Sequence, residues 1–444
     1  MRLEEIFNSK VTENGDLAFN KVGDNTLINI LFLTEYYQKH LNEVPTLGYS
    51  DKEQLFAMFI RDPRFGMGRR DLGRKLMTST HCSVEQVVKA GRVDDLFFTE
   101  YYNARTNWIL DWCKEQILLN NELVKKWMPR YSSKNLMLAR DIAKYWGMNK
   151  QQYGHFIKCN TTENKLSDHR FDDIEFEHTP SLAMLKYAKA FSTKPELANR
   201  YAQYLADVKA GKKELHVSTT NVYDIYKNRY NIDSDLFFSK LEKIKINCIP
   251  IVDTSGSMCD MNDSFGKALA IGHYLAKCST YCPDKVVSFS SRPQLITLGE
   301  TPKIQWNYGF NSIKPQNDSV YEREIASMFT GDCSNTDFDA VMNLLSQLDR
   351  DIPEYLVVLS DMEFDMGSRT SKEATMKLFK SKGYNTKIIW WNLNSRNITC
   401  PEMDADGNIF LSGYNPMLLK YLEVGFDNSA FLDKLLSEYS EAIK

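Results

Sequence analysis

The sequence predicts two parts, a helical N-terminal region over residues 1–244 and a doubly wound α/β domain over residues 245–444. Apolar side chains recur at helical spacing before residue 245, whereas short β-branched runs alternate with helical stretches after it. The charge divides at the same place. The first part has 36 Lys and Arg against 32 Asp and Glu (net +4), and the second has 19 against 26 (net −7).

The composition is that of an ordinary globular protein, with 43% hydrophobic and 25% charged residues over 444 positions. No run of about 18 apolar residues occurs, so we expect no membrane partner, and the N-terminus lacks the apolar core of a secretion signal. The nine Cys are scattered without a CxxC pair, which argues against a disulfide framework or a zinc ribbon. We therefore expect a cytoplasmic protein.

Three apolar stripes support the helical region. Between them lie short breaks such as 128–130 and 179–180, which is typical of helix hairpins stacked as an irregular solenoid. Gly211, which is followed by two lysines, is typical of the C-terminal end of a helix, here the one that carries the third stripe. The stripes are Trp108, Trp112, Leu119 and Leu123; then Leu138, Ile142 and Tyr145; and then Leu197, Tyr201, Tyr204, Leu205 and Val208.

Five short apolar runs predict the strands of the second part. Since buried parallel strands read as continuous apolar runs, their alternation with helices predicts a doubly wound sheet. The predicted strands are 245–252, 285–290, 355–360, 387–392 and 407–411, and the predicted helices are 263–280, 321–329, 337–349, 370–381 and 428–443.

Polar loops follow two of these strands and precede one helix. In such a sheet ligands collect at the carboxyl ends of the strands, and carboxylate and hydroxyl oxygens suit Mg²⁺. The alternative is that these side chains only cap the helices that follow them. The candidate ligands of Mg²⁺ or another divalent cation are Asp253, Ser255, Ser257, Thr336 and Asp361.

The segment Asp253–Ser257 resembles the DxSxS signature of von Willebrand factor A domains, and Thr336 and Asp361 match the later positions of that family. The resemblance implies a metal-ion-dependent adhesion site. In it Ser255, Ser257 and Thr336 would reach the metal directly, the two aspartates would act through water, and an acidic group of a protein partner would complete the shell. Neighbouring acids are interpreted as solvated residues of the rim, not ligands: Asp332, Asp337, Glu363 and Asp365.

The N-terminal region is similar, more loosely, to TROVE (Ro ribonucleoprotein) proteins, and closer to relatives that add a C-terminal A domain. The resemblance implies a HEAT-like helical ring or crescent that binds structured or misfolded RNA. The segments that carry it are 12–15, 61–70, 91–96 and 127–130.

Two basic clusters are candidate RNA contacts, because arginine forks suit phosphates and aromatic rings stack on bases. For the first cluster a structural alternative stays open, in which Asp62 and Asp71 pair with the arginines and clasp two helices together. The candidates are Arg64, Arg69, Arg70, Arg74 and Lys75 in the first cluster and Lys125, Lys126, Arg130 and Lys134 in the second, which continues to Arg140 and Lys144.

We expect no enzymatic activity, because the sequence lacks a Walker A motif, a strand-following GxGxxG and an HExxH pair. The expected function is thus RNA binding by a ribonucleoprotein-type chain whose A domain holds a cation. The alternative is a scaffold in an assembly or a virus particle that binds protein only. The oligomeric state is left open.

Overall fold

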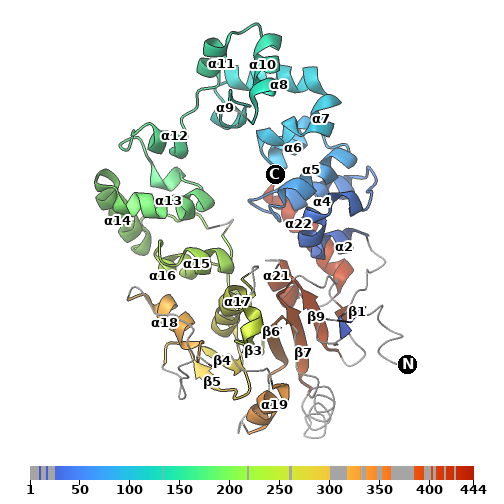
Figure 1. The fold of residues 1–444 in the computed structure, drawn as a ribbon, viewed down its shortest axis with the longest axis vertical. Coiled ribbons are helices and arrows are strands. Elements are labelled where there is room, and N and C mark those ends of the chain that lie inside the picture. The colour runs from blue at the N-terminus through green and yellow to red at the C-terminus, as the bar shows by residue number, and fades with distance from the viewer. Residues whose placement is uncertain are drawn as a thin grey trace. The chain divides into compact units, whose positions relative to one another are not determined.

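The computed structural model divides the chain into two compact units, which are described separately (Figure 1). Unit 1 comprises Met1–Lys39 and Thr220–Asp433, and unit 2 comprises His40–Thr219 and Lys434–Lys444. The structure describes residues 10–11, 17–18, 26–132, 134–217, 220–259, 263–300, 318–330, 332, 337–347, 353–361, 385–394, 402–403, 407–414, 417–424 and 427–444.

Unit 2 is helical over its described residues. Neighbouring helices pack in pairs, among them α4 with α5, α8 with α9 and α13 with α14. The elements are η1 (Leu41–Glu43), α4 (Asp51–Arg61), α5 (Arg70–Ser79), α6 (Val84–Ala90), η2 (Val93–Phe97), α7 (Thr99–Asn103), α8 (Thr106–Leu118), α9 (Glu122–Trp127), α10 (Leu136–Tyr145), α11 (Lys150–Phe156), α12 (Thr162–Ser167), η3 (Phe176–His178), α13 (Ser181–Thr193) and α14 (Pro195–Lys209), and α22 (Asn428–Ala442) ends in this unit.

Local sequence sets the ends of these helices. Ser50 caps α4 in a capping box with Glu53, and Asn149 caps α11 in the same way. Pro195 occupies the first turn of α14, where its missing N–H costs nothing. Gly211 has a φ of +71° just beyond that helix, as expected for a glycine that ends it.

The predicted stripes agree only in part with the buried faces. The third stripe is confirmed, since Leu197, Tyr201, Tyr204 and Val208 are buried in α14. The first is wrong. The buried face of α8 consists of Ile109, Leu110, Cys113 and Ile117, whereas Trp108, Leu119 and Leu123 are exposed.

Unit 1 holds a seven-stranded sheet with helices. Its strands follow the order β5-β4-β3-β6-β7-β9-β8. The elements are the hairpin β1 (Lys10–Val11) and β2 (Leu17–Ala18), α2 (Thr26–Phe32), α3 (Thr34–Lys39), α15 (Val222–Asn228), α16 (Ser234–Ser239), β3 (Cys248–Asp253), η4 (Gly256–Met258), α17 (Ser264–Cys278), β4 (Lys285–Phe289), β5 (Leu295–Thr297), α18 (Val320–Ser327), α19 (Phe338–Ser346), β6 (Tyr355–Ser360), β7 (Lys387–Asn392), β8 (Glu402–Met403), β9 (Ile409–Ser412), α21 (Met417–Val424) and the first turns of α22.

The sheet is mostly parallel. Strands β4, β3, β6, β7 and β9 run in one direction, and β5 and β8 are antiparallel edges. The chain passes from β3 to β4 on one side and later returns to place β6 on the other side of β3. The strand order therefore reverses between β3 and β6, which is the position where doubly wound sheets bind ligands.

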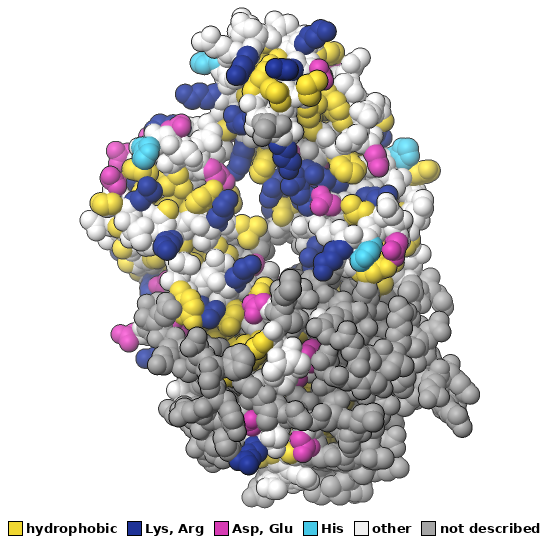
Figure 2. Space-filling model, viewed as in Figure 1, with side chains coloured by type: hydrophobic (Ala, Val, Ile, Leu, Met, Phe, Trp, Pro, Cys, Tyr) yellow, Lys and Arg dark blue, Asp and Glu magenta, His cyan; other side chains and the backbone are white. Residues whose placement is uncertain are grey.

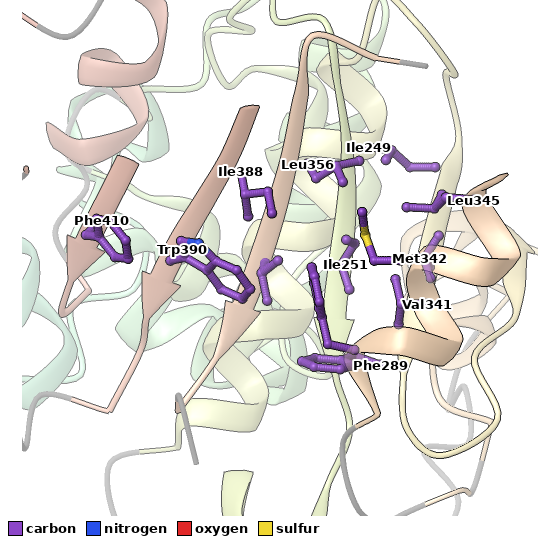
Figure 3. Packing of buried hydrophobic residues seen from close by; sticks show 13 residues of the cluster. Ile249, Ile251, Phe289, Val341, Met342, Leu345, Leu356, Ile388, Trp390 and Phe410 are labelled. Atoms are coloured by element: carbon purple, nitrogen blue, oxygen red, sulfur yellow. The ribbon is translucent and has the colours of Figure 1, made fainter. Parts of the chain in front are cut away.

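Helices pack on both faces of the sheet. On one face α19 packs on the apolar cluster shown in Figure 3, which includes Ile251, Leu356 and Trp390. On the other face α17 packs against β3, β4 and β6. Successive strand residues point to opposite faces, so both faces of β3 are buried.

The predicted mixed α/β class is confirmed: a helical region precedes a mostly parallel sheet, and strands form in all five predicted runs. The predicted helix at 370–381 lies outside the described residues. The boundaries between the compact units differ from the predicted domain boundary at 244/245, since the chain passes between the units after residues 39, 219 and 433. Helices α15 and α16 belong to unit 1, where α15 packs against α17, and unit 1 also includes the chain's first 39 residues.

Candidate metal centre and basic surfaces

Strands β3 and β6 end side by side at the reversal of strand order. The register pairs Val252 with Leu359, so the next residues, Asp253 and Ser360, are neighbours at the carboxyl edge. Both side chains are fully buried. The fold thus places the two strand ends, each followed by a predicted polar loop, side by side, although Asp253 and Ser360 are 107 residues apart in sequence.

Hydrogen bonds hold the carboxylate of Asp253 at both oxygens. Oδ1 accepts the backbone N–H of Ser255 at 2.9 Å, and Oδ2 accepts the hydroxyl of Ser360 at 2.5 Å. Burial raises the pKa of Asp253 to about 7, and the charge of Asp361 adds to the rise, whereas the bonds from Ser360 and Ser255 oppose it. A buried carboxyl with this pKa favours a compensating positive charge.

The two serines of the loop lie together. The hydroxyl oxygens of Ser255 and Ser257 are 3.0 Å apart. Adjacent oxygens in an octahedral shell at about 2.0–2.1 Å from Mg²⁺ are separated by about 2.9 Å. The two serine hydroxyls therefore suit a hard divalent cation in donor type and spacing, and the carboxylate of Asp253 suits it in donor type.

Two further acids lie at this edge. Asp361 follows β6 and is buried, with 6% of its surface exposed. Asp332 is also buried, at 4%, so the interpretation of Asp332 as a solvated rim residue is wrong. Its backbone carbonyl accepts the hydroxyl of Thr254, which draws the chain at residue 332 inward. Asp337, by contrast, is exposed and caps α19.

Part of the expected ligand set falls elsewhere. Thr336, Glu363 and Asp365 lie outside the described residues. Within the part of the chain that the structure describes, no group of three or more His, Cys, Asp or Glu side chains could hold a metal ion. The candidate centre therefore depends on serine hydroxyls as well as carboxylates.

Sequence reasoning missed the role of Ser360. The sequence places Ser360 only at the end of the strand predicted over 355–360. In the structure its hydroxyl donates a hydrogen bond to the carboxylate of Asp253. The sequence signal was only its place at the end of a predicted buried strand, where polar side chains gather in such sheets. That this strand lies next to β3 is known from the structure alone.

The first basic cluster lies in a network of ion pairs in unit 2. Arg61 Nη2 is 2.7 Å from Asp95 Oδ2, and both side chains are almost completely buried. Arg74 contacts the same carboxylate at 2.5 Å and Asp94 at 3.0 Å, and the more exposed Arg70 contacts Asp94 at 2.7 Å. The network joins α4 and α5 to η2.

The arginines thus pair with acids and join helices, as in the structural alternative, but their main partners are not Asp62 and Asp71. Asp62 pairs with Arg64 at 3.4 Å, and Asp71 is 3.8 Å from Arg74. The main partners, Asp94 and Asp95, belong to the 91–96 segment. Gly73 allows the close approach of α4 and α5, because a Cβ there would lie only 2.5 Å from the Cβ of Arg61.

Arg69 and Lys75, two further members of the first cluster, lie at the start of α5 and within it. Arg69 is the N-terminal capping position of α5 and is half-buried. Lys75 is half-buried in α5 and forms no ion pair with a described residue.

The second basic cluster is more exposed. Lys125 and Lys126 pair with Glu122 and Glu163, each at 3.0 Å. Arg130 is exposed and directs Nη2 toward the sulfur of Cys159 at 3.3 Å. Like Arg130, three further members of the cluster are exposed and form no ion pair with a described residue: Lys134, Arg140 and Lys144. The same holds for Lys150 and Lys158, which follow the cluster in sequence.

Aromatic and apolar side chains lie among these cations. Lys150 is 5.7 Å above the ring of Tyr131, and Arg92 is 4.5 Å above that of Trp127. Trp108, Met137 and Tyr145 are 48%, 67% and 44% exposed. Over α8–α11, at the top of Figure 2, dark-blue cations and yellow apolar side chains are adjacent on the surface.

No described helix is both long and apolar enough to cross a membrane. Two family models match separate stretches of the chain. The domain of unknown function DUF2828 matches residues 150–236, and the domain of unknown function DUF7788 matches residues 247–434. The second stretch contains the whole candidate metal centre.

Two known proteins are similar over most of the chain. The crystal structure of the Ro (RSR) protein of Deinococcus radiodurans matches with a TM-score of 0.39 and 12% identity, over 96% of this chain and 94% of that one. The uncharacterized protein L728 of Acanthamoeba polyphaga mimivirus is 25% identical in an alignment of 347 residues that covers 67% of this chain. The chain spans 57% of the length of that viral relative.

Proposed function

We propose that the chain is a non-enzymatic recognition protein whose α/β unit holds a divalent cation and presents it to an acidic group of a partner. The observation that carries this proposal is the convergence of Asp253, Ser255, Ser257 and Ser360 at the carboxyl edge of the sheet. The resemblance to the DxSxS signature of von Willebrand factor A domains supports it.

Ser255 and Ser257 would contact the cation directly, and Asp253 would supply negative charge from behind them. A cation held mainly by neutral hydroxyls keeps much of its positive charge, so it attracts a carboxylate strongly. No histidine lies in the motif to act as a base beside the serines, so binding, not hydrolysis, is the proposed outcome.

Calorimetry of the full chain with MgCl₂ tests the cation site. We expect one cation per chain, an affinity at least about tenfold weaker in Asp253→Asn and in Ser255→Ala, and no change in Ser346→Ala, a half-buried serine of α19 whose hydroxyl donates to the backbone of Asn343. Equal heats in all four proteins would refute the site.

The acidic partner is tested with poly-L-glutamate as probe and poly-L-glutamine as its neutral control. Binding of poly-L-glutamate should require Mg²⁺ and disappear with EDTA or in Ser255→Ala. Binding that survives EDTA would show that the cation is not the contact.

We further propose that the helical region, of the HEAT-like kind, binds RNA through the surface of α9–α11. From Leu123 to Thr162 the chain has eight Lys and Arg and one acidic residue, a net charge of +7. Arg140, Lys144 and Lys150 are exposed there without a described acidic partner, which leaves their charge available to phosphates. The resemblance of the N-terminal segments to TROVE proteins supports this proposal.

The first cluster has a weaker claim on RNA, because Arg70 and Arg74 already pair with Asp94 and Asp95. Anisotropy of a labelled stem-loop RNA with a single-stranded tail, measured over a salt series, tests the surface of α9–α11. Arg140→Glu with Lys144→Glu should weaken binding more than tenfold and lower the salt slope by about two.

Lys186→Glu with Lys189→Glu, an exposed lysine pair on α13, is the matched control and should leave affinity within a factor of about two. Equal losses in both double variants would indicate non-specific attraction. If the wild type has no affinity for RNA at any salt concentration, the protein-only scaffold is the better description.

A further inference from the structure

Thr254, between the first two candidate cation-site residues, is assigned no function by the signature, yet it is 1% exposed. Its hydroxyl donates to the backbone carbonyl of Asp332 at 3.1 Å, in a fully buried contact between residues 78 positions apart. Its own N–H donates to the carbonyl of Phe289, at the end of β4, at 3.4 Å. Thr254 thus connects the end of β3 to two neighbouring parts of the unit.

The contact continues on the side of Asp332. The N–H of Asp332 donates to the hydroxyl of Thr330 at 3.3 Å, and Thr330 and Asp332 are 2% and 4% exposed. Two threonine hydroxyls therefore satisfy both backbone groups of Asp332. Loss of the Thr254 hydroxyl removes a donor from this buried carbonyl, which carries a desolvation penalty.

We propose that Thr254 is a positioning residue of the cation site: its hydroxyl fixes the backbone at Asp332 against the loop that holds Ser255 and Ser257. This inference rests on the proposed function. Ser255 directly follows Thr254 in sequence. The Thr254 side chain therefore links the position of the two serines to that of the backbone at Asp332. Preorganised ligands bind a cation more tightly, since less order must be gained on binding.

Thr254→Val tests the inference, because valine keeps the shape and removes only the hydroxyl, and Thr254→Ser is the matched control that keeps it. We measure Mn²⁺ affinity of the full chain by calorimetry and hydrogen exchange of the Asp332 amide without metal. Thr254→Val should weaken Mn²⁺ binding about tenfold and speed exchange at Asp332, while Thr254→Ser stays within about twofold of the wild type in both.

Four outcomes separate the possibilities. Faster exchange with weaker binding in Thr254→Val alone supports the proposal. Unchanged Mn²⁺ affinity in Thr254→Val overturns it while the cation site stands. Equal losses in Thr254→Val and Thr254→Ser overturn it as well, because the hydroxyl would not be the cause. A wild type that binds no Mn²⁺ overturns both this inference and the proposed cation site.

Discussion

The hydroxyl of Ser360, at the end of β6, donates a hydrogen bond to the carboxylate of Asp253, at the end of β3. Both side chains are fully buried, and the bond crosses the position where the strand order of the sheet reverses. It fixes the carboxylate that would stand behind a cation held by Ser255 and Ser257, and it lowers the cost of keeping that carboxylate charged.

Removal of this donor should weaken the site. In Ser360→Ala we expect Mg²⁺ affinity to fall by a factor of about ten, because one oxygen of the buried Asp253 loses its hydrogen bond. Calorimetry on the full chain measures the change, and Ser346→Ala provides the control outside the candidate ligand set. An affinity in Ser360→Ala equal to the wild type would mean that the bond does not support the site.

The buried pair of Arg61 and Asp95 should contribute far more to stability than the exposed pair of Arg70 and Asp94. We expect Arg61→Gln to lower the free energy of unfolding by about 3–5 kcal/mol, because it leaves a buried carboxylate short of a partner. Arg70→Gln, the same substitution at a half-exposed site, should cost less than about 1 kcal/mol. Urea unfolding of the two variants measures both values, and similar losses would contradict the network described for unit 2.

Acidification should destabilise unit 1 through His273 and Glu324. His273 Nε2 is 2.7 Å from Glu324 Oε2, and Lys277 contacts the other oxygen of that carboxylate. Burial lowers the pKa of His273 below its usual 6.5 although the contact with Glu324 opposes the shift. Burial would raise the pKa of Glu324, but the bonds from His273 and Lys277 outweigh it and lower that pKa below 4.5.

Both folded-state pKa values are depressed, so the unfolded chain binds protons first as the pH falls. The stability should therefore be highest above about pH 6.5 and decline as the pH falls through the range below it. Thermal unfolding at a series of pH values measures this decline. It should be shallower in His273→Gln and unchanged in His155→Gln, an exposed histidine in unit 2. Identical slopes in all three proteins would assign the acid sensitivity to other groups.

The strands could be predicted from the sequence because each buried parallel strand is a short β-branched run. Tyr355–Ser360 and Lys387–Asn392 are recovered at the predicted residues. The neighbouring positions of Asp253 and Ser255 also follow from local sequence. That Ser360 faces Asp253 does not, because it depends on the register between two strands more than 100 residues apart.

The ion-pair partners in unit 2 could not be predicted for a related reason. Asp62 and Asp71 are close to the arginines in sequence, but Asp94 and Asp95 are brought to Arg70 and Arg74 by the packing of η2. The face of α8 was misassigned because large aromatic residues were expected inside. Trp108 is instead half-exposed, and smaller side chains such as Cys113 fill the interior.

The central claim is that a divalent cation binds at the hydroxyls of Ser255 and Ser257 with Asp253 behind them. Anomalous diffraction from crystals of the full chain soaked in Mn²⁺ tests it most directly. We expect one strong peak within coordination distance of both serine oxygens, about 2.0–2.3 Å, and no peak in crystals of Ser255→Ala. A peak bound only by other residues, or equal peaks in both crystals, would contradict it.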